Sequence, residues 1–124
     1  MHFLIYRMPV LVYMVLIFYM SSGPVDTRIA GELPDWLLHG AAYLVLYLLA
    51  FWAVHEGMRP RPGRGGFVLP LLVTVLYGVS DEIHQGFVPA RDASARDAIA
   101  DAAGALLGVG LVRLYGRRKA ATAV

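Results

Sequence analysis

Residues 41–53 read AAYLVLYLLAFWA, and this stretch decides the fold class. It carries no charged side chain, and it lacks the polar face that recurs every 3.6 residues in the helices of a soluble bundle. Residues 10–20, VLVYMVLIFYM, lack such a face as well. The two stretches therefore favour helices that lie in a lipid bilayer over a soluble four-helix bundle.

The composition agrees with this interpretation. The chain has 124 residues, enough for one small domain, of which 58% are hydrophobic and only 16% charged. Its mean hydropathy is +0.59. A formal net charge of +2 excludes the basic footprint of a nucleic-acid-binding protein. The absence of cysteine excludes disulfides, thiolate metal sites and cysteine nucleophiles, so any metal would need His, Asp or Glu ligands.

Four apolar segments predict the architecture, and short stretches between them hold nearly all the charges. Because a bilayer requires about 20 apolar residues per helix, we expect helices over about 4–20, 36–55, 67–85 and 95–115. The predicted fold is an all-α membrane protein, with four transmembrane helices in a small bundle that forms a single domain over residues 1–124. The first segment, with Arg7 before the apolar run and Ser21 after it, is also compatible with a cleaved signal peptide. Apolar residues 3–6 ahead of Arg7 favour an anchor instead.

The basic residues set the expected orientation. Eight of the eleven Lys and Arg residues are Arg7 or lie within residues 59–64 and 113–119. With four crossings these groups fall on one side of the membrane, and the positive-inside rule assigns that side to the cytoplasm. We therefore expect both termini to be cytoplasmic and the loops at about 21–35 and 86–97 to face outward.

This topology gathers polar residues from distant parts of the chain at the outer membrane face. Asp81 and Glu82 end the third segment, where the negative end of the helix dipole disfavours carboxylates, so His84, Arg91, Arg96 or a bound cation should compensate them. Two interpretations stay open: an ion-pair cluster that closes the bundle, and a ligand or substrate site. The candidates for such a site are His39, Asp81, Glu82, His84, Arg91 and Asp97.

No cofactor is required by the sequence pattern. His39 near two carboxylates has the chemistry to transfer protons or to share a divalent cation. Its spacing to the acidic residues matches no known metal motif. We therefore expect no cofactor, and a divalent cation stays open as the weaker interpretation.

The start of the fourth segment has a local structural explanation. Ser94-x-x-Asp97 before an apolar run is a capping-box pattern, with Ser94 as the N-cap and Asp97 at the third helical position. Asp101, Gly104 and Gly108 continue the same helix face, where small residues allow a neighbouring helix to approach closely. Asp101 is expected to be protonated, to pair with an arginine or histidine, or to belong to the site.

Polar and small residues form a longer motif between residues 35 and 108. It runs through Asp35-x-x-x-His39-x-x-x-Tyr43, Tyr77-Gly78-x-x-Asp81-Glu82-x-His84-Gln85-x-Phe87-x-Pro89-x-Arg91, Ser94-x-x-Asp97 and Gly104-x-x-x-Gly108. This motif resembles the VanZ-like family of membrane proteins. The resemblance implies a small polytopic protein of a bacterial inner membrane, in a family whose name-giving members are associated with resistance to the glycopeptide antibiotic teicoplanin. The sequence departs from the family at Asp101, where Asn is more frequent. The positions that carry over are His39, Tyr43, Asp81, Glu82, His84, Gln85, Arg91, Ser94 and Asp97.

The functional interpretation follows from this placement. We expect the outward-facing site to bind or process a cell-envelope component, with Arg91 contacting an anion, Asp81 and Glu82 contacting a cation or hydroxyl groups, and His39 or His84 moving protons. One alternative is a membrane-embedded hydrolase or transferase that acts on a lipid-linked envelope substrate, and another is a structural or partner-binding module. Whether the protein is an enzyme stays open. The expected partners are the lipid bilayer and an envelope precursor or glycopeptide, and no nucleic acid.

Overall fold

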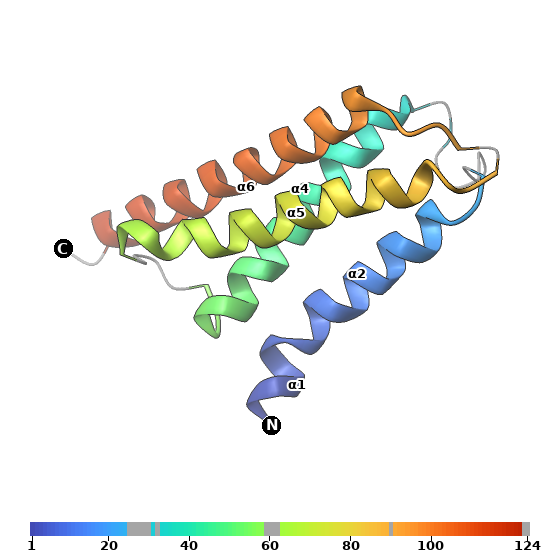
Figure 1. Ribbon diagram of the computed structural model, residues 1–124. Helices are drawn as coiled ribbons and strands as arrows, with labels where there is room; N and C mark the ends of the chain where they lie inside the picture. The colour runs from blue at the N-terminus through green and yellow to red at the C-terminus, as the bar shows by residue number, and fades with distance from the viewer. Residues whose placement is uncertain (25–30, 32, 59–62, 90, 123–124) are drawn as a thin grey trace.

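The computed structural model describes residues 1–24, 31, 33–58, 63–89 and 91–122, and no strand occurs among them. Its elements are α1 (His2–Tyr6), α2 (Met8–Ser21), α4 (Asp35–His55), the 3-10 turn η1 (Arg64–Phe67), α5 (Val68–Gln85) and α6 (Ala95–Ala121), as Figure 1 shows. Three helical stretches are long and apolar enough to cross a membrane: Asp35–His55, Gly65–Gln85 and Ala95–Ala121. The shorter α2 is apolar as well. The predicted all-α membrane bundle is confirmed.

The first predicted helix differs most from the structure. Instead of one helix over 4–20, the chain forms α1 and α2 with a break at Arg7, whose backbone φ is −104°. Pro9 in the first turn of α2 explains the break, because proline has no N–H to donate to the carbonyl four residues earlier. The fourth helix continues past the predicted end at 115 to Ala121. Its last turn contains Arg118 and Lys119, and cations are favourable at this negative end of the helix dipole.

The bundle is built around α4, which packs most extensively against α6. Glycines on α6 allow this close approach, as the sequence predicted. A Cβ at Gly104 would lie 2.1 Å from the backbone oxygen of Gly40, and one at Gly108 would lie 2.5 Å from the Tyr47 ring. Both contacts are far below van der Waals distance, so only glycine fits at these two positions on the α4–α6 interface.

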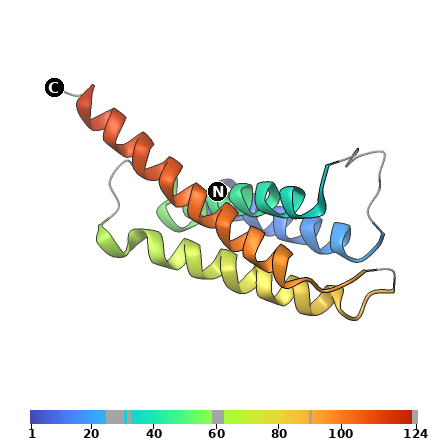
Figure 2. The same cartoon turned by 90° about the horizontal axis from the view of Figure 1, so that it is seen from above.

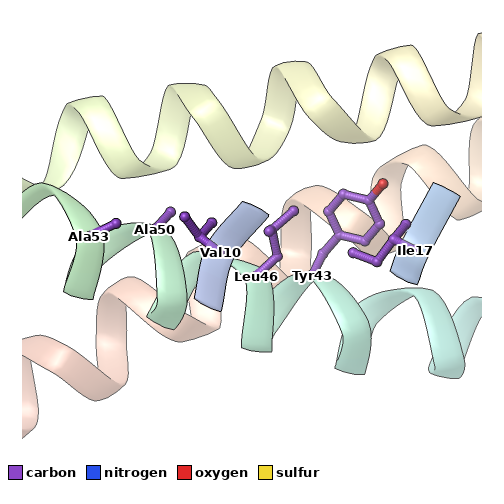
Figure 3. Close-up of a cluster of buried hydrophobic side chains, with 6 residues drawn as sticks. All are labelled: Val10, Ile17, Tyr43, Leu46, Ala50 and Ala53. Atoms are coloured by element: carbon purple, nitrogen blue, oxygen red, sulfur yellow. The ribbon is translucent and has the colours of Figure 1, made fainter. Parts of the chain in front are cut away.

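A second contact holds α2 against α4. Figure 3 shows Val10 and Ile17 of α2 beside Tyr43 and Leu46 of α4, in a cluster that continues along α4. Tyr77 of α5 donates a hydrogen bond of 2.5 Å to the carbonyl of Met14, which also joins α2 to α5.

Many large apolar side chains of the other helix faces are exposed, as expected for surfaces that contact lipid.

One end of the bundle, which we call the polar end, contains the buried polar residues His39, Asp81, Glu82, Asp97 and Asp101. At the polar end α2 and α5 finish and α4 and α6 begin, on the right of Figure 1, whereas α6 finishes and α5 begins at the opposite end, as Figure 2 also shows. The last turns of α6, which contain Arg117 and Arg118, therefore lie at the opposite end. Arg59 and Arg61, which contribute to the predicted orientation, lie outside the described residues.

Candidate functional site

Asp81 joins three helices at the polar end. Its carboxyl group is buried, with 4% of the residue exposed. Ser21 of α2 donates a hydrogen bond of 2.6 Å to Oδ1. Tyr43 of α4 and Gln85 of α5 donate to Oδ2 over 3.4 and 3.3 Å. Both oxygens of Asp81 therefore have at least one neutral hydrogen-bond donor.

A second buried group contains His39 of α4, Glu82 of α5 and Asp101 of α6, which we call the His39 cluster. The Nδ1 atom of His39 lies 3.0 Å from Oδ1 of Asp101 and 3.6 Å from Oε1 of Glu82. Asp81 and Glu82 are consecutive on α5 and point about 100° apart, which explains why Glu82 and not Asp81 belongs to this cluster. Asp101 is thus paired with a histidine, one of the outcomes expected from the sequence.

The capping box predicted at α6 does not form. Ser94 is the N-cap residue and Asp97 stands in the first turn, but the Ser94 side chain makes no capping hydrogen bond. The backbone N–H of Ser94 instead donates 2.9 Å to Oε2 of Glu82. A carboxylate from α5 therefore replaces the local Asp97 as the acceptor, because α5 ends directly beside the start of α6.

Two buried carboxylate oxygens of the His39 cluster have no hydrogen-bond partner. They are Oε1 of Glu82 and Oδ2 of Asp101, in residues that are only 7% and 2% exposed. Oδ2 of Asp101 lies against Gly78, where a Cβ would come within 3.2 Å of it. Buried polar atoms are almost always paired, so these two oxygens mark the least satisfied point of the polar end.

Arg91 ties the segment before α6 to the end of α2. Its Nε donates 2.7 Å to the carbonyl of Gly23, and its Nη2 donates 2.9 Å to the carbonyl of Met20. The carboxylate of Asp35 lies 3.7 Å from Nη1. A guanidinium has five N–H donors, so Arg91 keeps donors for a further acceptor. The sequence offered Arg91 as a group that compensates Asp81 and Glu82, but Arg91 pairs with Asp35 and with backbone carbonyls instead.

The remaining predicted residues lie around these groups. His84 stacks on Phe18, with ring centroids 4.4 Å apart, and its Nε2 lies 3.0 Å from the hydroxyl of Ser22. Asp97 is buried, and its carboxylate lies within 4.8 Å of ligand atoms of His39 and Asp35. Arg96 lies over the ring of Trp36, at 5.5 Å from its centroid. Neither His84 nor Arg96 therefore forms an ion pair with the acidic pair on α5 within the described part of the chain.

Comparison with known proteins assigns the family. The sequence model of the VanZ/LLP1 family matches residues 3–116. The chain belongs to the VanZ/LLP1 family. The match runs from α1 into α6 and so includes the whole polar end, which confirms the resemblance found in the sequence. No curated protein and no solved structure matched the chain.

The polar end of this VanZ/LLP1 protein contains a cavity of about 680 Å³. Apolar side chains of α2 and α4, among them Leu16 and Ile17, form one part of its lining, and polar groups form another. Of the six candidates from the sequence, His39, Asp81 and Arg91 line this cavity, whereas Glu82, His84 and Asp97 do not.

Ser21 is a site residue that the sequence did not single out. It lines the cavity and donates the shortest hydrogen bond to Asp81. Its signal in the sequence is a serine at the end of an apolar segment, next to the predicted outer face. That signal also fits a signal-peptide cleavage site, so position alone could not identify its partner.

Proposed function

We propose that this VanZ/LLP1 protein binds an amphiphilic cell-envelope component, with an anionic head and an apolar chain, at the outer face of a bacterial inner membrane. The observation that carries the proposal is the cavity of about 680 Å³, in which Arg91 and Asp81 share a lining with apolar side chains of α2 and α4. Its size falls within the range of about 300–1,000 Å³ that is typical of small-molecule sites. We further propose that occupation of this site alters susceptibility to glycopeptides such as teicoplanin.

The chemistry of the lining supports an anionic head group. The free N–H donors of Arg91 would contact a phosphate or carboxylate, which guanidinium groups bind with paired hydrogen bonds. Ser21 and His39 offer contacts for hydroxyl groups on the same head. The apolar chain would lie against Leu16 and Ile17, which face the cavity from α2.

The proposed orientation rests on charge. Arg113, Arg117, Arg118 and Lys119 lie on the part of α6 that leads away from the polar end. Because basic residues are retained in the cytoplasm, this arrangement supports cytoplasmic termini and an outward-facing polar end. An outward-facing site agrees with a ligand of the cell envelope.

A membrane-embedded hydrolase or transferase is a second candidate, and one contact favours it. The hydrogen bond of 3.0 Å between His39 and Asp101 is the arrangement that orients a histidine as a general base. This candidate predicts turnover of a lipid-linked substrate that stops in His39→Gln. The binding proposal predicts a complex with no change in the ligand.

The test measures binding of a fluorescent polyprenyl phosphate to the full chain in nanodiscs, with the matched polyprenyl alcohol as the uncharged probe. We expect the phosphate to bind more tightly than the alcohol, and Arg91→Gln to weaken phosphate binding by about 10–100-fold, because a charge-assisted contact is lost. Arg96→Gln is the matched control, since Arg96 lies over Trp36.

A second variant separates loss of binding from loss of folding. Asp35→Asn removes the carboxylate that lies 3.7 Å from Arg91, and therefore should strengthen phosphate binding. A misfolded protein would not gain affinity. Equal affinity for phosphate and alcohol, or unchanged binding in both Arg91→Gln and Asp35→Asn, would refute the proposal.

A further inference from the structure

The His39 cluster has a feature that the proposed ligand cavity does not use. Glu82 and Asp101 do not line that cavity, yet each has a buried oxygen without a partner. The unpartnered Oε1 of Glu82 points towards His39, at 3.6 Å from Nδ1. We propose that His39, Glu82 and Asp101 bind a divalent transition-metal cation of the Zn²⁺ or Mn²⁺ type.

Charge balance supports a cation at this point. Two ionised carboxylates beside a neutral imidazole carry a net charge of −2, and burying unpaired charge is costly. Among the described residues, no Lys or Arg lies within ion-pair distance of Glu82 or Asp101, since Arg91 is turned to Asp35. A divalent cation neutralises this set, whereas a protonated His39 compensates only half of it.

The spacing of the ligand atoms also supports a cation. One ligand atom from each of the three residues lies within 4.8 Å of the others. Ligands at about 2.0–2.2 Å from a tetrahedral zinc ion lie about 3.3–3.6 Å apart. The distance of 3.6 Å from Nδ1 of His39 to Oε1 of Glu82 lies at the upper end of that range, and the 3.0 Å from Nδ1 to Oδ1 of Asp101 lies just below it. An imidazole nitrogen among the ligands favours Zn²⁺ over Mg²⁺ and Ca²⁺, which select oxygen ligands, and the two carboxylates also suit Mn²⁺.

Three helices converge at this cluster, so a cation would join α4, α5 and α6 at one point. The second group that contains His39, with Asp35 and Asp97, is less suited to the ion. Asp35 is 45% exposed in its side chain and is turned to Arg91, and this group has no unpartnered buried oxygen. The proposal does not rest on the proposed envelope ligand, because it concerns the metal alone.

The test uses the purified full chain in detergent, stripped with a chelator and then titrated separately with Zn²⁺, Mn²⁺ and Mg²⁺. Bound metal is measured by elemental mass spectrometry after desalting. We expect one Zn²⁺ or Mn²⁺ per chain. Asp101→Asn and Glu82→Gln should lose about 100-fold or more in affinity, since each removes a ligand and the loss of a group that only orients a ligand already costs about 10–100-fold. His84→Gln is the matched control outside the His39 cluster, and it should retain the metal.

A thermal measurement keeps the proposal testable if a variant folds poorly. Adding the metal should raise the unfolding temperature of the stripped wild-type protein and leave that of Asp101→Asn unchanged. The proposal is overturned if the wild type binds less than one ion per chain and gains no stability. It is also overturned if Asp101→Asn binds the ion as tightly as the wild type, or if Asp97→Asn alone abolishes binding.

Discussion

Gly104→Ala should separate α4 from α6 and disturb the polar end from one turn away. The added Cβ would lie 2.1 Å from the backbone oxygen of Gly40 and 3.0 Å from the backbone nitrogen of Leu44. Backbone atoms cannot turn away as a flexible side chain can, so the two helices must move apart by more than about 1 Å to reach ordinary contact distance.

The expected magnitude follows from two opposing effects. Overpacking typically costs about 1–3 kcal/mol, and a clash with backbone belongs at the upper end of that range. Replacing glycine by alanine inside a helix raises the free energy of unfolding by about 1 kcal/mol through helix propensity. We therefore expect Gly104→Ala to lower the free energy of unfolding by about 2 kcal/mol. Gly110→Ala, where a Cβ meets nothing within 4 Å, should raise it by up to about 1 kcal/mol.

The difference of about 3 kcal/mol between the two variants isolates the steric effect, since both gain the same helix propensity. It is measured by reversible unfolding in mixed micelles, followed by the fluorescence of Trp36 and Trp52, which both lie on α4. The same displacement would stretch the 3.0 Å contact between His39 and Asp101 to about 4 Å, beyond hydrogen-bond range. Equal stability of the two variants would refute the close approach of α4 and α6.

Two further substitutions test the partners of the site residues. Ser21→Ala removes the hydroxyl that donates a 2.6 Å hydrogen bond to Asp81. It should lower the free energy of unfolding by about 1–2 kcal/mol, which lies between the typical contributions of a hydrogen bond in a membrane protein and of a hydrogen bond to a charged group. Ser22→Ala, at an exposed hydroxyl, should cost less than about 0.5 kcal/mol, and equal losses would contradict this assignment. Gly78→Ala would place a Cβ 3.0 Å from Cε1 of Tyr43. Unfolding in micelles should show a free energy of unfolding lower by about 1–2 kcal/mol. A variant as stable as the wild type would show that the Tyr43 ring can move away.

The helices could largely be predicted because apolar segments and their polar boundaries are local properties. The predicted helices over 36–55 and 67–85 agree within a few residues with α4 and with η1 followed by α5. The break at Arg7 was missed, since the apolar pattern continues through it and only Pro9 signals the interruption. The extension of α6 was missed because hydrophobicity ends before the helix does.

The sequence could predict that the site residues lie at the same end of the bundle, but not which of them contact each other. Helix order places His39, Asp81 and Glu82 at that end, but it does not fix how each helix is rotated about its axis. That rotation depends on the glycine contacts between α4 and α6. These contacts bring Asp101 within hydrogen-bond distance of His39. Arg91 shows the same limit, since its long side chain donates to the carbonyls of Met20 on α2 and of Gly23 just after α2, and no sequence pattern singles out these carbonyls.

The sequence left two interpretations of the polar end open, a structural cluster and a ligand site, and each of the two buried acids of α5 supports a different one. Asp81 receives three hydrogen bonds from three helices, which is what a structural lock requires, and it achieves this with neutral donors. Glu82 has one oxygen satisfied by Ser94 and another that faces His39 without a hydrogen bond. A purely structural cluster would gain stability by partnering that oxygen. The adjacent carboxyl groups therefore have different roles in our interpretation: Asp81 holds α2 to the bundle, and Glu82 is kept available for a ligand.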